Sequence, residues 1–268
     1  METMRLTFLG TGTSIGVPII GCKCRTCTSR DSHDQRLRSS VLISIKGSDS
    51  KRTTNIVIDA GPDFRQQMLR SHTSKVDAIL LTHEHYDHVG GIDDVRGLNY
   101  SMRQDIDIYG IPRVASTVKR NLPYVFTPTP YPGAPKINLH EIKETEPFDV
   151  SGIKVIPLPV IHGQLPIVGY RIGTLSYITD ASMVPDETFE LLKGSKVLVI
   201  NALRPEPHPS HFSVVQAVEI AKRVGAEQTY FTHICHEMPT MRRAANELDL
   251  PSNIHLAYDK LQIKIEQQ

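Results

Sequence analysis

The sequence has little of what marks membrane, secreted or nucleic-acid-coating proteins. Its 268 residues carry a formal net charge of +1, with no basic excess of the kind that binds nucleic acid through phosphate contacts alone. No window holds the roughly 18 consecutive apolar residues that a membrane-spanning helix needs. The opening stretch, METMRLTFLGTGTSIG, lacks a basic segment, a long apolar run and a cleavage site, so it predicts a β-strand and not a signal peptide. We therefore expect a cytoplasmic protein without a membrane partner, and the composition argues against a nucleic-acid partner.

Cysteine is also scarce, with four residues in the chain. In the cytoplasm such cysteines are more often metal ligands or free thiols than disulfides. The remaining composition, 40% hydrophobic and 22% charged, is that of an ordinary globular protein long enough for a large core. There is no internal repeat of short period and no low-complexity linker. We expect one domain, residues 1–268.

Strand patterns occur in two groups, each mixed with helical patterns. The strand-like stretches are residues 4–10, 40–47, 55–61, 75–83, 152–163, 167–173, 175–182, 196–203, 228–237, 253–259 and 261–267. Helical spacing is found in 63–72, 89–100 and 213–226. The arrangement predicts an α/β fold in which two sheets pack together with helices outside.

Three details of this pattern are specific enough to check. Asp63 is a plausible N-cap for the first helix, with Phe64, Met68 and Leu69 on one face, and Ser213 is the cap of the last one. The stretches 40–47 and 55–61 read as a hairpin around a polar loop. Residues 121–136 hold five prolines and are therefore neither helix nor central strand. They form either a surface excursion or a lid over a substrate.

The most informative stretch is THEHYDH, residues 82–88, directly after a predicted buried strand. It places His83, His85, Asp87 and His88 in one short loop at the end of a sheet, where α/β folds usually bind ligands. Imidazole nitrogen and carboxylate oxygen are ligands of zinc, manganese and iron. A catalytic metal takes about three protein ligands, so four donors indicate two metals.

A second metal requires further donors, and they occur at the ends of later strands. These donors are His162, Asp180 and His233. Each alone is weak evidence, because a single histidine at the end of a strand is more often structural. Three of them in chain order behind the first motif favour a dinuclear site.

This series of residues resembles the signature of the metallo-β-lactamase superfamily, H-x-H-x-D-H followed by His, Asp and His. The resemblance covers nearly the whole chain and implies a four-layer αββα sandwich. Carried over by position, it implies that one metal is bound by His83, His85 and His162, and the other by Asp87, His88 and His233. Asp180 would bridge them, as in the phosphodiesterase and thioesterase branches. Asp59, at the end of another strand, is expected to orient a ligand from behind.

Three cysteines in GCKCRTC form a second candidate metal site. Cys22, Cys24 and Cys27 have a spacing that lets three thiols face one tetrahedral zinc, which needs a fourth ligand. We expect His236 in that place; Cys235 is the rival, although its side chain should face away from the site. The combination resembles the PhnP-like phosphodiesterases of the carbon–phosphorus lyase pathway, which pair a dinuclear centre with a Cys₃His structural zinc.

Two further segments complete the candidate site. The stretch HPSHFS holds His208 and His211, and the resemblance implies that a histidine here, preferably His211, assists the leaving group, while His208 is expected to be exposed and idle. Asp87 and His211 are the expected catalytic residues. The glycine-rich GTGTSIG mimics a dinucleotide-binding loop, but its spacing and the following Pro18 exclude that interpretation. We expect this loop to line the metal site.

These residues predict a hydrolase with two divalent ions, zinc or manganese, in the active site and one structural zinc. The expected substrate is a small phosphodiester, cyclic or nucleotide-like, attacked by an activated water. Three alternatives stay open: a tRNA 3′-processing endonuclease, a thioesterase of the glyoxalase II kind, and a metal-binding scaffold without catalysis. The oligomeric state is also open, a homodimer included.

Overall fold

The computed structural model describes residues 3–47 and 52–266, and residues 48–51 of the expected polar hairpin loop lie outside this range. Its helices are α1 (Phe64–Arg70), α2 (Tyr86–Val89), α3 (Val95–Met102), α4 (Pro112–Asn121), α5 (Asp186–Leu192), α6 (Val214–Val224) and α7 (Met241–Glu247). Short 3-10 turns cover Ser32–Asp34 and Ile92–Asp94. No helix within the described ranges has both the length and the apolar character needed to cross a membrane.

The first sheet has seven strands in the order β14-β1-β2-β3-β4-β5-β6. Their bounds are β1 (Thr3–Gly10), β2 (Ser40–Lys46), β3 (Thr53–Ile58), β4 (Ala78–Leu80), β5 (Ile106–Gly110), β6 (Ile137–Glu141) and β14 (Gln262–Glu266). Strands β14, β1, β2 and β3 pair antiparallel, whereas β3, β4, β5 and β6 pair parallel. The parallel half ends at one edge of the sheet, which places the segments following β3 and β4 side by side.

The second sheet repeats this plan with the order β13-β12-β11-β10-β9-β8-β7. Its strands are β7 (Phe148–Val150), β8 (Ile153–His162), β9 (Leu165–Ile172), β10 (Leu175–Tyr177), β11 (Val197–Asn201), β12 (Gln228–Thr232) and β13 (Ile254–Leu256). The pairs from β7 to β10 are antiparallel and those from β10 to β13 are parallel. All five residues of β11, VLVIN, are buried, as expected of a strand covered on both faces.

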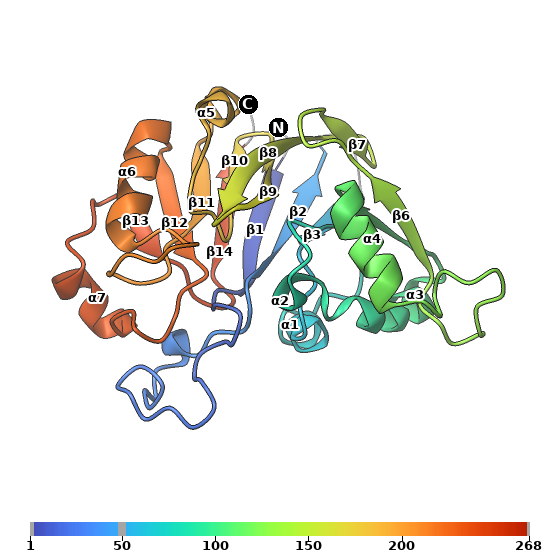
Figure 1. The fold of residues 1–268 in the computed structure, drawn as a ribbon, viewed down its shortest axis with the longest axis horizontal. Coiled ribbons are helices and arrows are strands. Elements are labelled where there is room, and N and C mark those ends of the chain that lie inside the picture. The colour runs from blue at the N-terminus through green and yellow to red at the C-terminus, as the bar shows by residue number, and fades with distance from the viewer. Residues whose placement is uncertain (1–2, 48–51, 267–268) are drawn as a thin grey trace.

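The two sheets face each other across one apolar core. Side chains from both sheets meet there, among them Phe8, Tyr170 and Tyr177, each at most 1% exposed. A second apolar cluster joins the outer face of the second sheet to α5, α6 and α7. Figure 1 shows α1 to α4 on the side of the first sheet and α5 to α7 on the other side. The predicted αββα sandwich is confirmed.

Most predicted elements are present, with local exceptions. Helix α6 has the expected cap: Ser213 accepts from the backbone N–H of Gln216, and Gly225 ends the helix with φ +70°. Asp63 flanks α1 but makes no side-chain cap, because its carboxylate binds Arg38 instead. Leu69 is 55% exposed, so the predicted single apolar face of α1 was wrong at that residue.

The predicted helix over residues 89–100 is broken. Residues 90 and 91 form a turn and residues 92–94 a short 3-10 helix between α2 and α3. The reason is a close approach: a Cβ on Gly91 would lie 1.9 Å from the carbonyl oxygen of Gly61, so only glycine fits there. Sequence patterns had also not indicated β5, β6, β7, α4, α5 or α7.

Candidate dinuclear metal centre

Two of the predicted donors, and the acid expected behind them, lie where strands end and the chain turns sharply. Asp59 follows β3, Asp180 lies beyond β10 and His233 follows β12. All three have positive φ angles of 64°, 60° and 54°, a left-handed backbone that costs energy in residues other than glycine. Strain of this kind collects at functional sites. Here the left-handed backbone at these three residues directs their side chains into the space between the ends of the two sheets.

His83, His85 and His162 form the first group of donors, with one ring nitrogen of each within 4.8 Å of the others. The ring of His162 is oriented from behind, because its Nδ1 donates to the carbonyl oxygen of Ser210 at 2.8 Å. The Nδ1 of His83 lies 3.0 Å from the hydroxyl of Thr82. In both rings this leaves Nε2 available for a ligand.

Asp87, His88, Asp180 and His233 form the second group, and all four residues are buried. His88 Nε2 lies 3.0 Å from a carboxylate oxygen of Asp87 and 3.3 Å from Asp180 Oδ2. His233 Nδ1 lies 3.0 Å from Asp180 Oδ1. Behind the group, Asp59 accepts from His88 Nδ1 at 2.7 Å.

Asp180 lies between the two groups. Its Oδ2 is 3.8 Å from His83 Nε2 in the first group and 3.3 Å from His88 Nε2 in the second. This is the position that a bridging ligand occupies in a dinuclear centre. All seven predicted donors are thus brought together by the fold, and their function as ligands remains a prediction.

Burial and mutual charge dominate the electrostatics of the site. Burial lowers the pKa of His83 well below its usual value, and the nearby His88 lowers it further. Burial also opposes charge on His88, but the carboxylates of Asp180, Asp59 and Asp87 outweigh it and raise its pKa well above the usual value. The carboxylates of Asp59, Asp87 and Asp180 are themselves buried, so these charges interact in a space largely shielded from solvent.

The donor atoms fit divalent cations. His83 Nε2, His88 Nε2 and His233 Nδ1 are buried and have no hydrogen-bond partner of acceptable geometry. An unsatisfied buried polar atom is costly, and most proteins avoid it. Three such nitrogens pointing at carboxylates in one space are explained if they bind metal ions, which supply the missing partner.

Two glycines allow the motif to pack against the end of β3. A Cβ on Gly61 would lie 1.9 Å from the carbonyl oxygen of Asp87. The backbone N–H of Ala60 binds the carbonyl of His88 at 2.8 Å, and that of Gly91 binds the carbonyl of Ala60 at 2.8 Å. Helix α2, which carries Asp87 and His88, therefore lies directly on the turn that presents Asp59.

His211 lies beside both groups, with ring centroids 4.7 Å from His162 and 4.9 Å from His233. Its Nδ1 is buried and has no hydrogen-bond partner. Burial and the neighbouring His233 lower the pKa of His211 to about 3, so the ring is neutral at pH 7 in the free chain. His208 is half-buried and stacks on His211 at 5.1 Å, so the expectation that it is exposed was wrong.

Residues that the sequence had not singled out support the site. Thr82 donates from its N–H and hydroxyl to Asp59, and the carbonyl of Ser210 orients His162. Asn201 holds the turn after Asp180, because its side chain binds both the N–H and the carbonyl of Ala181. Asn201 is the last residue of β11. A polar residue at the end of a buried strand is the sequence signal that could have identified it.

The cysteine site is equally well assembled. Cys22, Cys24, Cys27 and His236 place their ligand atoms within 4.8 Å of one another. His236 Nδ1 lies 3.3 Å from Cys22 Sγ and 3.5 Å from Cys24 Sγ. Cys235 is buried elsewhere, with its sulfur near Glu237. The structure thus places His236, and not Cys235, beside the three thiols.

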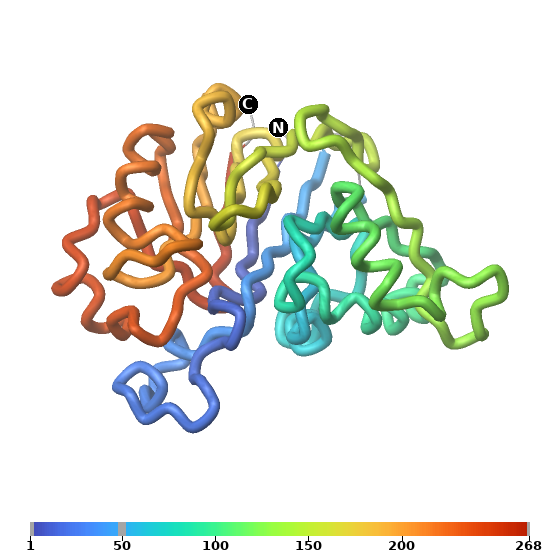
Figure 2. Tube along the Cα trace, viewed as in Figure 1, coloured from blue at the N-terminus to red at the C-terminus, as the bar shows by residue number. Residues whose placement is uncertain are grey.

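The pKa values of two of these thiols are shifted in opposite directions. Burial raises the pKa of Cys24, but the N–H of Cys27 and the ring of His236 outweigh it and lower the pKa to about 6. Burial raises the pKa of Cys27 to about 11. Figure 2 shows this N-terminal segment, in blue, beside the C-terminal part of the chain in red. The side chain of Thr26 donates to the carbonyl of Met238 at 3.0 Å, joining the same two segments.

The loop GTGTSIG lies next to the segment that follows His233, and its place in the lining of the metal site stays a prediction. The N–H of Thr13 binds the carbonyl of Ile234 at 3.2 Å, one residue beyond His233. Gly10 is required for this course, because a Cβ there would lie 2.1 Å from the carbonyl oxygen of Arg38.

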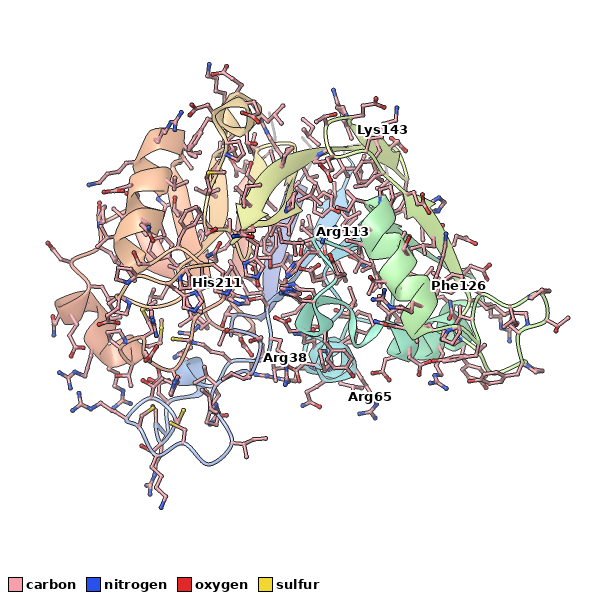
Figure 3. The ribbon with its side chains drawn as sticks, in the orientation of Figure 1. Arg38, Arg65, Arg113, Phe126, Lys143 and His211 are labelled. Atoms are coloured by element: carbon pink, nitrogen blue, oxygen red, sulfur yellow. The ribbon has the colours of Figure 1, made fainter. Side chains whose placement is uncertain are left out.

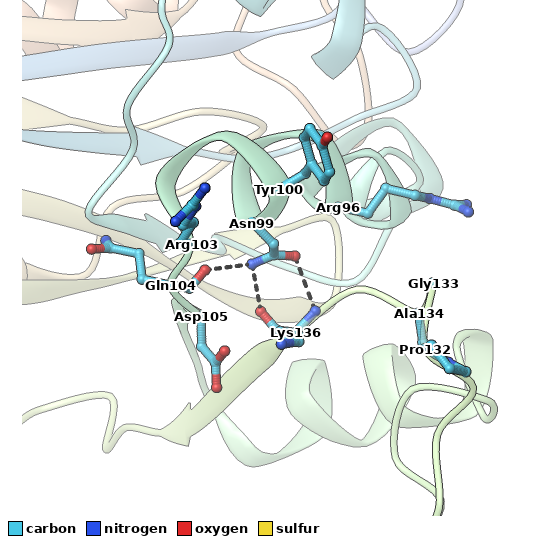
Figure 4. Close-up of a pocket in the computed structure, with 11 residues that line it drawn as sticks. Arg96, Asn99, Tyr100, Arg103, Gln104, Asp105, Pro132, Gly133, Ala134 and Lys136 are labelled. Carbon is cyan, nitrogen blue, oxygen red and sulfur yellow. Dashed lines mark hydrogen bonds between the residues drawn. The ribbon is translucent and has the colours of Figure 1, made fainter.

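The proline-rich segment 121–136 extends from the end of α4 along α3 and beyond it (Figure 1). Pro132, Gly133 and Ala134 line a cavity of about 660 Å³ together with α3 residues, and none of the predicted metal ligands lines it. Figure 4 shows Asn99 of α3 binding the backbone of Lys136, which attaches the end of the segment to α3. These contacts describe a surface excursion beside α3.

Comparison with known proteins agrees with this geometry. A family model described as the β-lactamase superfamily domain matches residues 54–234. The crystal structure of a diphosphatase from the PhnP family is 39% identical with a TM-score of 0.89, over 100% of this chain and 99% of that one. An octanoyltransferase of Porphyromonas gingivalis is 42% identical over 266 residues, 99% of this chain and 52% of that protein. Ribonuclease BN of Cronobacter sakazakii is 29% identical over 210 residues, 74% of this chain and 61% of that protein.

The chain therefore belongs to the β-lactamase superfamily, whose metallo-β-lactamase sandwich it adopts. It shares its fold over the full length with a PhnP-family protein. It spans about half the length of the Porphyromonas gingivalis protein, at 52%.

Proposed function

We propose that this protein is a metal-dependent hydrolase that cleaves a small phosphodiester, cyclic or nucleotide-like. Membership of the superfamily and the similarity to a diphosphatase support a hydrolytic enzyme. The observation that carries the finer proposal is the complete set of seven donors with Asp180 placed between the two groups. The similarity to a PhnP-family diphosphatase supports phosphorus as the reacting centre.

The donor set suits two divalent ions, zinc or manganese, because it consists of imidazole and carboxylate alone. His83, His85 and His162 would hold one ion, and Asp87, His88 and His233 the other, with Asp180 shared. When bound, such a pair lowers the pKa of water towards 7 and neutralises charge on phosphate oxygens. Cys22, Cys24, Cys27 and His236 would hold a separate structural zinc.

The chain's own residues orient the reaction. Asp59 and the Ser210 carbonyl hold His88 and His162 with their free nitrogens towards the shared space. Attack of water on phosphorus forms one P–O bond and breaks the bond to the leaving alkoxide, which takes up the proton released by the water. His211, neutral in the free chain, donates an N–H hydrogen bond to the departing oxygen.

Two other substrates have a specific observation in their favour. Similarity to ribonuclease BN favours an RNA substrate, but segment 121–136 has no charge except Lys136 and the chain is near neutral. Similarity to an octanoyltransferase, of which this chain matches 52%, is a reason to test an acyl substrate such as the thioester of the glyoxalase II alternative. A cytoplasmic location and a homodimer remain predictions.

One comparative assay tests the proposal. The metal-loaded protein is given bis(p-nitrophenyl) phosphate, cyclic nucleotides, an octanoyl thioester and a tRNA precursor at equal concentrations. We expect turnover of the phosphodiesters and the highest kcat/KM for one of them. A clear preference for the thioester or the tRNA precursor would overturn the phosphodiesterase proposal in favour of that alternative.

Metal content provides an independent check. Elemental analysis of the purified protein by mass spectrometry should give about three metal ions per chain, two from the histidine and aspartate donors and one from the cysteine site. A value near one would refute either the dinuclear centre or the cysteine site. If the Cys24→Ser variant then loses this metal ion, the ion is at the cysteine site and the dinuclear centre is refuted; if the variant keeps it, the cysteine site is refuted.

A further inference from the structure

The motif loop is attached to β9 at successive points along that strand. The hydroxyl of Tyr170 donates to the carbonyl of Leu81 at 2.6 Å, and the N–H of Val168 donates to the carbonyl of Thr82 at 3.2 Å. The backbone N–H groups of residues two apart in a strand point to the same side. The next N–H on the side of the Val168 N–H would therefore belong to residue 166, which is a proline. Proline has no N–H to donate. A further direct backbone bond from β9 to the motif is therefore impossible at that point.

Arg113 takes the place of the missing donor. Its guanidinium donates through Nη1 to the carboxylate of Glu84 and through Nη2 to the carbonyl oxygen of Pro166. Arg113 is the second residue of α4, on the side of that helix facing β8 and β9 (Figure 3). One side chain thus joins three segments: the motif loop, α4 and the start of β9.

The joined segments are those that carry the first group of donors. Glu84 lies between His83 and His85 in the chain. Pro166 pairs with Ile161 in the β8–β9 hairpin, and its neighbour Leu165 pairs with His162. A fork that binds Glu84 and Pro166 therefore sets the distance between the loop of His85 and the strand end of His162.

This group is the one that needs such support. His85 is exposed and His162 half-buried, whereas the second group is entirely buried. Within the described residues no hydrogen bond orients the His85 ring, which contacts the rings of His83 and His162 at centroid distances of 4.6 and 5.1 Å. The ring of His85 is therefore held through its backbone, and that backbone is attached through Glu84.

We propose that Arg113 is a positioning residue for the exposed half of the metal centre: by binding Glu84 and the Pro166 carbonyl together, it keeps His83, His85 and His162 converged on one cation. This proposal rests on one part of the proposed function, namely that the first group of donors binds a metal ion. The charge of Arg113 is compensated by Glu84, so its part is geometric and not the attraction of an anionic substrate. A bidentate fork of this shape is particular to arginine, which lysine cannot reproduce.

The test compares Arg113→Met and Arg113→Lys with the unchanged protein. The control is Arg120→Met, which removes an exposed arginine from the last turn of the same helix. The first readout is zinc affinity in competition with a chelator. We expect Arg113→Met to weaken one of the two sites of the dinuclear centre about 10- to 100-fold, the usual effect of removing a group behind a ligand. Arg113→Lys should fall between, and Arg120→Met should have no effect.

The second readout is amide hydrogen exchange in the metal-free proteins. Residues 83–86 and 163–167 should exchange faster in Arg113→Met, and the rest of the chain should not. Faster exchange with unchanged zinc affinity would reduce Arg113 to a structural tether and overturn the proposal, as would unchanged exchange.

The two proposals fail in different ways. If the unchanged protein binds no metal at the histidine donors, the dinuclear centre falls and the positioning function with it, whatever hydrogen exchange shows. If it binds two ions there and Arg113→Met binds both equally tightly, the positioning function alone is refuted.

Discussion

The carboxylate of Asp59 and the ring of His88 are 2.7 Å apart, and both side chains are completely inaccessible to solvent. Asp59 also accepts hydrogen bonds from the N–H and the hydroxyl of Thr82, the residue that opens the THEHYDH motif. One carboxylate at the end of β3 thereby orients a ring in α2 and holds the start of the motif after β4. Asp59 therefore orients His88 of the second group directly, and it reaches the first group through Thr82, whose hydroxyl lies 3.0 Å from His83 Nδ1.

Replacing Asp59 should weaken metal binding without removing a ligand. In Asp59→Asn the side chain keeps its size, but His88 loses the carboxylate that orients Nδ1 and strengthens Nε2 as a donor. We expect zinc affinity at the second group to fall about 10- to 100-fold. Calorimetric titration with zinc measures it, and the exposed Asp105→Asn is the control. Equal affinity in Asp59→Asn would show that Asp59 has no such function.

Removing a donor should abolish turnover while the fold remains. His85→Ala and Asp180→Ala each remove one of the seven donors, and activity should fall at least about 1000-fold because the activated water is lost. Circular dichroism should be unchanged. His140→Ala, an exposed histidine on β6, is the matched control. Full activity in either purified donor variant would refute the site.

The cysteine site should bind zinc for stability and not for chemistry. His236→Ala should lose one zinc per chain and unfold at a lower temperature, because structural zinc contributes on the order of 10 kcal/mol of binding energy to folding. Cys235→Ala removes the neighbouring thiol, which lies apart from the other three, and should keep its zinc. If Cys235→Ala loses the zinc and His236→Ala retains it, the ligand assignment is reversed.

The contact between Gly61 and the motif should tolerate no side chain. A Cβ in Gly61→Ala would meet the carbonyl of Asp87, so α2 must move away; we expect a loss of about 1–3 kcal/mol in the free energy of unfolding and weaker metal binding. Gly97→Ala in α3 is the control, because no atom lies within 4 Å of its Cβ. It should be neutral or stabilising by up to about 1 kcal/mol. Denaturant titration distinguishes the two.

Asp77 predicts a pH dependence of stability. Burial raises its pKa, but the N–H of Asn55 and the side chains of Arg52 and Lys75 outweigh burial and lower it. A lowered folded-state pKa means that the stabilisation is complete above the unfolded value near 3.9 and is lost as the pH falls through the folded value.

Comparison with Asp77→Asn measures this contribution. Because both cations are at least 37% exposed and screened, we expect a difference of about 1 kcal/mol in unfolding free energy at pH 7. The difference should shrink progressively below about pH 4. A difference that is constant from pH 7 to pH 3 would exclude a titrating Asp77 as its cause.

Local chemistry explains why much of this fold is readable from the sequence. The buried run of β11 and the capping box of Ser213 act within a few residues, so their pattern is enough to predict strand and helix. Leu69 and Gly91 show where this fails. Leu69 is exposed because no other element within the described residues covers that side of α1, and the helix breaks at Gly91 because the loop at Gly61 packs against it. The spacing of apolar residues within one segment carries no information about either neighbour.

For the site, the sequence by itself determined the chemical kinds of donor and their order at strand ends, because side-chain chemistry belongs to each residue alone. Only the tertiary structure decided that Asp180 lies between the two groups, that His236 and not Cys235 joins the thiols, and that Arg113 joins Glu84 to the Pro166 carbonyl. Such contacts connect residues 29 to 214 positions apart. They depend on how two sheets and their outer helices pack, which is a property of the whole core and not of any segment.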